Sequence, residues 1–127
     1  MKTIMIFGNE DFEYDNGAIK LIGFLKETLP EYSVFRASRP EQLMDFIGRD
    51  FIILDVAKGI EKPIAITDVD DIKYAMKVTA HDMDLASFLK ILKEVGELTK
   101  VKIVAIPNNR NPEEFKEEVI KLIRSFE

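Results

Sequence analysis

Short apolar runs recur along the chain and are separated by longer stretches in which apolar residues return at helical spacing. The apolar runs predict β-strands at residues 3–7, 32–36, 51–54, 62–67 and 101–106. Residues 3–7 and 51–54 are apolar throughout, as a strand buried on both faces requires. We therefore expect 51–54 to be a central strand, and the short run at 32–36 to lie near an edge of the sheet.

Helices are predicted in the intervals between these strands. They cover residues 18–29, the stretch from Ser38 to Gly48, the stretch after Asp84, and the stretch that begins at Asn111-Pro112. Ser38 and Glu41 have the spacing of a capping box, in which each side chain accepts a hydrogen bond from the other residue's amide. The predicted core faces of the last two helices are Leu85, Phe88, Leu89, Leu92 and Val95, and Phe115, Val119, Leu122 and Phe126. No element is predicted for the acidic residues 68–74.

Strands that alternate with helices at these intervals indicate an α/β fold. We expect residues 1–127 to form a single domain: a three-layer sandwich in which a mostly parallel, twisted sheet carries helices on both faces. The chain contains no internal repeat and no low-complexity segment that would suggest a linker.

The composition narrows the range of functions. A net charge of −5 argues against nucleic acid as the main partner. No apolar run reaches the length of a membrane span, and Met1-Lys2 is too short for a signal peptide, so we expect no membrane insertion. The absence of cysteine excludes disulfides, zinc–thiolate sites and a cysteine nucleophile. Together these features favour a cytoplasmic protein.

The corner between the first strand and the first helix is strongly acidic. Within 8–17 it carries Glu10, Asp11, Glu13 and Asp15. Two like charges about 4 Å apart repel by about 4 kcal/mol at an effective dielectric of 20, so this corner would repel a phosphate and attract a cation. A flavodoxin-like or nucleotide-binding site is therefore disfavoured. A serine hydrolase is also disfavoured, because the sequence has no Gly-x-Ser-x-Gly motif.

Three residues are candidates for the chemistry of the protein. Asp15 closes the acidic corner, Asp55 follows the central strand, and His81 is the only histidine. The loops that hold them leave a parallel sheet at the same edge, where two carboxylates and an imidazole would form an open metal site. Structural interpretations remain open: Asp15 as a helix cap, Asp55 as a turn or cap residue, and His81 as a surface or cap residue.

Three motifs resemble those of the endopeptidases that mature the large subunit of [NiFe]-hydrogenases. Gly8-Asn9 followed by Asp15 is similar to the family's glycine–asparagine–acid pattern. Residues 53–57, Ile-Leu-Asp-Val-Ala, resemble its strand that ends in an aspartate, and 80–85, Ala-His-Asp-Met-Asp-Leu, resemble its histidine motif. The chain departs from the pattern at Asp11, where the family has an apolar residue, and at Gly17, where the glycine comes one place late.

The resemblance implies a twisted sheet between helices and a single proteolytic cut. The cut would remove a C-terminal tail from the hydrogenase large-subunit precursor once nickel has been inserted. Asp15, Asp55 and His81 would be the catalytic and nickel-contacting residues, with the nickel contributed by the substrate and no tightly bound cofactor of the protease's own. We expect a monomer. The alternative is a degenerate relative that serves as a non-catalytic metal- or partner-binding module.

Overall fold

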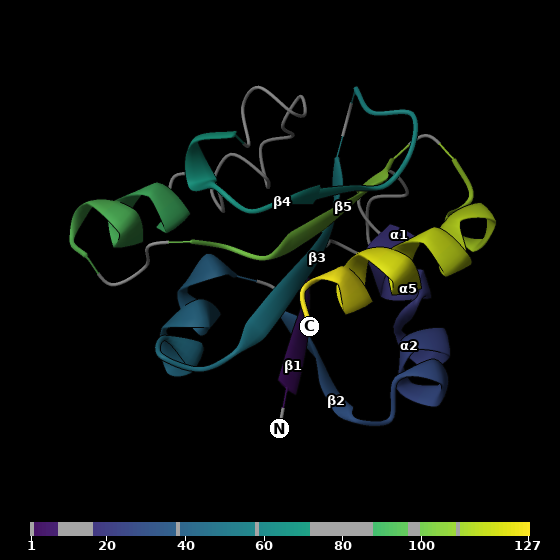
Figure 1. Ribbon diagram of the computed structural model, residues 1–127, viewed down its shortest axis with the longest axis horizontal. Coiled ribbons are helices and arrows are strands. Elements are labelled where there is room, and N and C mark those ends of the chain that lie inside the picture. The colour runs from purple at the N-terminus through teal and green to yellow at the C-terminus, as the bar shows by residue number, and fades with distance from the viewer. Residues whose placement is uncertain are drawn as a thin grey trace.

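The computed structural model describes residues 2–7, 17–37, 39–57, 59–71, 88–96, 100–108 and 110–127. Its strands are β1 (Lys2–Phe7), β2 (Tyr32–Ala37), β3 (Phe51–Ala57), β4 (Ile64–Ile66) and β5 (Ile103–Pro107). They form one sheet in the order β2-β1-β3-β5-β4, with β4 antiparallel to β5 and all other neighbours parallel (Figure 1). The predicted mostly parallel sheet is confirmed.

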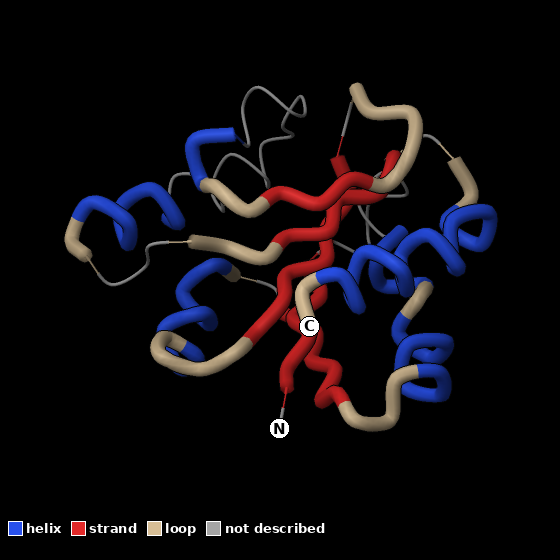
Figure 2. The backbone as a smooth tube through the Cα atoms, in the orientation of Figure 1, coloured by secondary structure: helices blue, strands red, loops and turns tan. Residues whose placement is uncertain are grey.

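Helical segments cover both faces of this sheet. They are α1 (Gly17–Lys20), α2 (Ile22–Thr28), the 3-10 helices η2 (Pro40–Phe46), η3 (Val69–Asp71) and η4 (Pro112–Phe115), a helix at 88–94, and α5 (Lys116–Ser125). Figures 1 and 2 show α1, α2 and α5 on one side of the sheet, with η2 and helix 88–94 on the other. This is the three-layer α/β arrangement that the sequence predicts.

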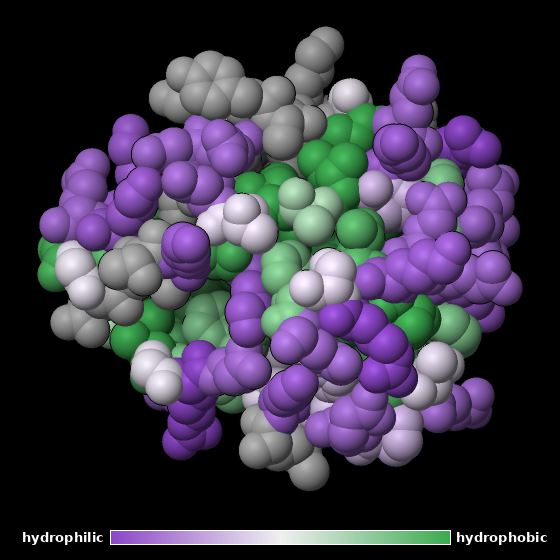
Figure 3. Space-filling model, in the orientation of Figure 1, coloured by the Kyte–Doolittle hydropathy of each residue, from purple (hydrophilic) through white to green (hydrophobic). Residues whose placement is uncertain are grey.

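The core lies on both faces of the sheet because successive strand residues point to opposite sides. In β3, Leu54 and Val56 belong to the core beneath α1, α2 and α5, whereas Ile53 and Ala57 belong to the core beneath η2 and helix 88–94. Polar side chains cover the surface over α5, and apolar atoms reach the surface around β4 and β5 (Figure 3). Among the described residues, no helix has the length and apolar character needed to cross a bilayer.

The strand predictions hold, with shifts of one to three residues at several strand ends. β3 is the middle strand and β2 an edge strand, as expected. β3 continues to Ala57, three residues beyond the predicted end, so Asp55 lies inside the strand rather than after it. β4 is shorter than predicted and occupies the other edge.

The single helix predicted at 18–29 is wrong, because the structure breaks it at Leu21. There the Leu21 amide donates to the Ala18 carbonyl at 3.1 Å, a contact three residues back that tightens the turn between α1 and α2. Leu21 is fully buried. At this tighter turn, the apolar side chain of Leu21 packs into the core against the sheet.

The start of η2 also differs from the predicted capping box. The Arg39 amide donates to Gln42 Oε1 at 3.0 Å. The predicted box paired Ser38 with Glu41, so the observed pair lies one residue further along the chain. Ser38 lies outside the described residues. The helix begins at Pro40 and ends before Gly48, whose φ of 85° suits glycine and agrees with the predicted stop.

The predicted core faces are partly correct. Leu89 and Leu92 are buried, but Val95 is 64% exposed because helix 88–94 ends before it. Leu85 lies outside the described residues. Asn111 is a helix cap as predicted and accepts from the Glu113 amide at 3.1 Å, but the helix it caps is the short η4, which precedes α5. In α5 the fully buried side chains are Val119 and Ile123, whereas the predicted Leu122 and Phe126 are only partly buried.

Candidate functional site

Successive strands are added to the sheet on one side of β1 and then on the other, so the strand order reverses between β1 and β3. From β1 the chain passes through α1 and α2 to β2 on one side, then returns through η2 on the other face to β3 on the other side of β1. In doubly wound sheets, ligands bind at such a switch point, in the crevice beyond the carboxyl ends of the strands. The ends of β1 and β3 therefore define the candidate site.

Asp55 is the only acidic residue of β3 and lies two residues before the carboxyl end of that strand. It is 1% exposed, and its Oδ1 accepts the Val56 amide at 2.8 Å. In the sheet it is paired with Ala105 of β5. Burial of a carboxylate costs several kcal/mol, which an aliphatic residue at this position would avoid. Since Asp55 lies within a strand, the interpretation as a turn or helix-cap residue is wrong.

Gly17 fixes the start of α1 against the same strand. A Cβ atom on Gly17 would lie 3.1 Å from Val56 Cγ1 and 3.6 Å from Ile106 Cδ1. A side chain at position 17 would therefore force Val56 Cγ1 to give way by a few tenths of an ångström. Sequence reasoning missed this role, although the small pair Gly17-Ala18 at the head of a helix is a signal of close packing.

The other two candidates, Asp15 and His81, lie outside the described residues, as do Glu10, Asp11 and Glu13. The predicted convergence of the three residues thus stays a prediction. Within the described ranges, no three histidine, aspartate or glutamate side chains lie together as a metal-binding group.

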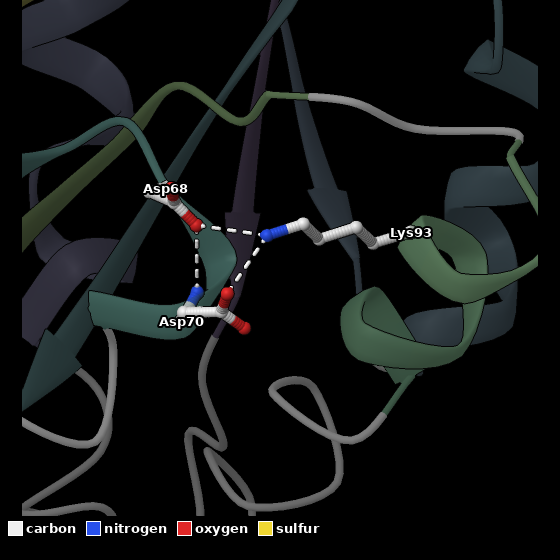
Figure 4. A network of polar contacts seen from close by, with 3 residues as sticks. All are labelled: Asp68, Asp70 and Lys93. Atoms are coloured by element: carbon white, nitrogen blue, oxygen red, sulfur yellow. Dashed lines mark hydrogen bonds and ion pairs between the residues drawn. The ribbon is translucent and has the colours of Figure 1, made fainter.

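An ion-pair network connects the two chain segments that flank residues 72–87. Lys93 Nζ of helix 88–94 lies 3.2 Å from Asp68 Oδ1 and 2.8 Å from Asp70 Oδ2, and the Asp70 amide donates to Asp68 Oδ1 at 2.9 Å (Figure 4). The Asp70 amide, followed by Lys93, holds the pKa of Asp68 below its usual value. Hydrogen bonds to Asp70 and then Asp68 raise the pKa of Lys93.

This network joins the turn at Asp68 and Asp70 to helix 88–94. Single exposed ion pairs contribute little to stability, but here one ammonium group bridges two carboxylates from a short turn. In its described part, the candidate site thus consists of the switch point between β1 and β3, the buried Asp55, and the start of α1, where Gly17 packs against β3. These features define a doubly wound α/β protein with a candidate site at the carboxyl edge of its sheet.

Comparison with known proteins gives the family. The sequence model of the hydrogenase maturation protease family matches residues 38–125, more than half of the chain, and the chain therefore belongs to this family. The matched range includes Asp55 and His81, and Asp15 precedes it. The predicted family resemblance is confirmed, and with it a role as a processing protease.

Two solved structures have a similar fold. The hydrogenase 3 maturation protease matches with a TM-score of 0.65 and 18% identity, over 95% of this chain and 87% of that chain. An uncharacterized protein from Wolinella succinogenes matches with a TM-score of 0.57 and 22% identity, over 84% of this chain and 72% of that chain. No curated protein sequence matches.

Proposed function

We propose that this protease removes the C-terminal tail of a [NiFe]-hydrogenase large-subunit precursor after nickel has been inserted. Membership of the maturation protease family supports the proposal. The observation that carries it is the buried Asp55, a carboxylate placed in the central strand next to the β1/β3 switch point despite the cost of its burial. We expect the protease to act as a cytoplasmic monomer without a tightly bound cofactor of its own.

In this proposal Asp15, Asp55 and His81 contact the nickel of the substrate. Carboxylate oxygens and an imidazole nitrogen are suitable ligands for Ni²⁺. In the sequence, Asp15 precedes Gly17 by two residues. Gly17 approaches Val56, the residue after Asp55.

Two chemical roles are open to these side chains. They can hold the substrate so that its nickel polarises the scissile carbonyl or a water. Alternatively, they dock the nickel while one carboxylate acts as general base toward water. In both cases His81 would contact the nickel through the neutral imidazole.

The test is cleavage of a purified nickel-loaded precursor, followed as mass loss from the large subunit. Asp15→Asn, Asp55→Asn and His81→Ala are each expected to slow cleavage by at least about 100-fold. Asp45→Asn is the matched control, because Asp45 is an exposed aspartate of η2 outside the three motifs, and this variant should cleave normally.

Two results would contradict the proposal. One is normal cleavage by the Asp55→Asn or His81→Ala variant with its fold intact by circular dichroism. The other is equal cleavage of nickel-free precursor. If the wild-type chain binds the loaded precursor and never cleaves it, the non-catalytic binding module is favoured instead.

A further inference from the structure

A groove of about 720 Å³ opens at the amino edge of the sheet, away from the candidate site. We call it the amino-edge groove and define it by Lys2, Phe35, Phe46, Arg49 and Asp50. These residues come from the start of β1, from β2, from the end of η2 and from the turn before β3. Asp55 is five residues further along than Asp50, about 16 Å at the rise of a strand. The groove is thus separate from the carboxyl-edge crevice.

Two aromatic rings form the apolar part of the groove. Phe35 is 48% exposed on the edge strand β2, and its ring centroid lies 5.8 Å from that of Phe46 in a tilted arrangement. Aromatic side chains presented to solvent in this way are typical anchors of protein interfaces, because covering them removes a large apolar area from water.

The charges of the groove are opposite in sign to the net charge of the chain. The Arg49 guanidinium lies 5.9 Å from the Phe46 ring centroid, beside the two phenylalanines. Lys2 also lines the groove, but its Nζ lies 5.8 Å from the ring centroid of Tyr32, which belongs to the core on the other face of the sheet. Neither cation forms an ion pair with a carboxylate of the described residues. The one acid of the groove, Asp50, is neutralised by Lys102 at 2.6 Å. A chain with a net charge of −5 thus presents a cationic groove here.

We propose that the amino-edge groove docks an extended acidic segment of a partner protein. An aromatic or aliphatic residue of that segment would pack on Phe35 and Phe46, and its carboxylates would face Arg49, with Lys2 at the rim of the groove. Charge complementarity favours this occupant, since an acidic peptide gains attraction from the local cations. The proposal is independent of proteolysis, because the groove and the candidate site lie at opposite edges of the sheet.

The experiment uses a fluorescein-labelled ten-residue peptide with a central phenylalanine flanked by aspartates and glutamates. Fluorescence anisotropy at low salt should show saturable binding that weakens as salt is added. Arg49→Gln should weaken binding about five-fold and Phe35→Ala about ten-fold. A peptide with lysine in place of the acids should not bind.

Arg110→Gln is the matched control. Arg110 is also an exposed arginine over a phenylalanine, with its Cζ 5.4 Å from the Phe115 ring centroid, but it lies outside the groove. Its substitution should leave peptide binding unchanged. Circular dichroism should show the same fold for all three variants, since each side chain is largely exposed.

Several outcomes would overturn the proposal. These are no saturable binding, equal weakening by Arg49→Gln and Arg110→Gln, and equally tight binding of an oligonucleotide of the same charge. Self-association of the wild-type protein that is lost in Phe35→Ala would assign the groove to a second copy of this chain instead. Sedimentation at increasing protein concentration detects that case.

Discussion

Gly17 and Val56 are so close that a methyl group on Gly17 would lie 3.1 Å from Val56 Cγ1. The contact joins the start of α1 to the strand that carries the buried Asp55. Because Val56 is covalently next to Asp55, any displacement of α1 acts on the backbone of the candidate site. A packing contact between two apolar groups thus contributes to the geometry of a polar site.

Gly17→Ala should therefore destabilise the protein, because Val56 and α1 must move apart to admit the new methyl group. The expected loss is about 1–2 kcal/mol in the free energy of unfolding, measured by urea titration. Gly23→Ala is the matched control: a Cβ there would meet nothing within 4 Å, and Gly23 lies in α2. It should stabilise the protein by about 0.5–1 kcal/mol. Equal effects of the two substitutions would contradict the role of the contact.

Lys93→Met should lower thermal stability through loss of the contacts with Asp68 and Asp70. The folded-state pKa of Asp68 is below the usual 3.8, so its contribution is present above that pH and is lost as the pH falls further. The pKa of Lys93 is raised above 10.5, so its contribution is present below that pH and is lost in stronger alkali.

The melting temperatures of the wild type and Lys93→Met should accordingly differ at neutral pH and converge in strong acid. Lys90→Met is a suitable control, since Lys90 is an exposed lysine of the same helix with no ion pair among the described residues. A difference between the wild type and Lys93→Met that does not change with pH would argue against the ion pairs as its cause.

Tyr32→Phe tests the connection between β2 and the end of the chain. The Tyr32 hydroxyl donates to Glu127 Oε1 at 2.8 Å, and burial, followed by this hydrogen bond, raises the pKa of Tyr32 well above its usual 10.0. The folded state therefore favours the neutral phenol. This contribution is present below pH 10 and is lost as the pH rises toward the folded-state pKa.

Tyr32→Phe should cost about 1 kcal/mol at neutral pH. It should also remove part of the alkaline loss of stability seen in the wild type. Urea titrations at neutral and at high pH measure both effects. An unchanged alkaline profile would show that another group titrates.

Ile123→Ala should be more destabilising than Leu122→Ala. Ile123 of α5 is fully buried in the core, whereas Leu122 of the same helix packs only partly against that core. Removal of a fully buried aliphatic side chain typically costs about 2–5 kcal/mol, and a partly exposed one costs less. Chemical denaturation measures both changes. A larger loss of stability for Leu122→Ala than for Ile123→Ala would show that the helix face predicted from the sequence is the one packed in the core.

The layered fold could be predicted from the sequence because its signals are local. The apolar runs at 3–7 and 51–54 require burial on both faces, and β1 and β3 are central strands. The errors arise where tertiary packing decides. Leu21 breaks a continuous helical pattern because the sheet buries it, and nothing in the spacing of residues 18–29 signals the tighter turn.

The candidate site was predicted less completely than the fold. Asp55 was identified as an acid near the end of a central strand, but its place inside β3 follows from pairing with β5, a contact distant in sequence. The sequence did not show the part that Gly17 plays. Asp15 and His81 remain predictions that depend on motif resemblance, because side chains from loops converge only through the whole fold.

The position of β5 has a consequence for the newly made chain. β4 is attached to the sheet through β5 alone among the described strands, although it comes earlier in the sequence. While the ribosome is still making residues 100–107, β1, β2 and β3 can already pair, but β4 has no neighbour to join. The edge of β3 then stays open until β5 emerges, and in that interval it is the segment most exposed to chaperones or to wrong partners.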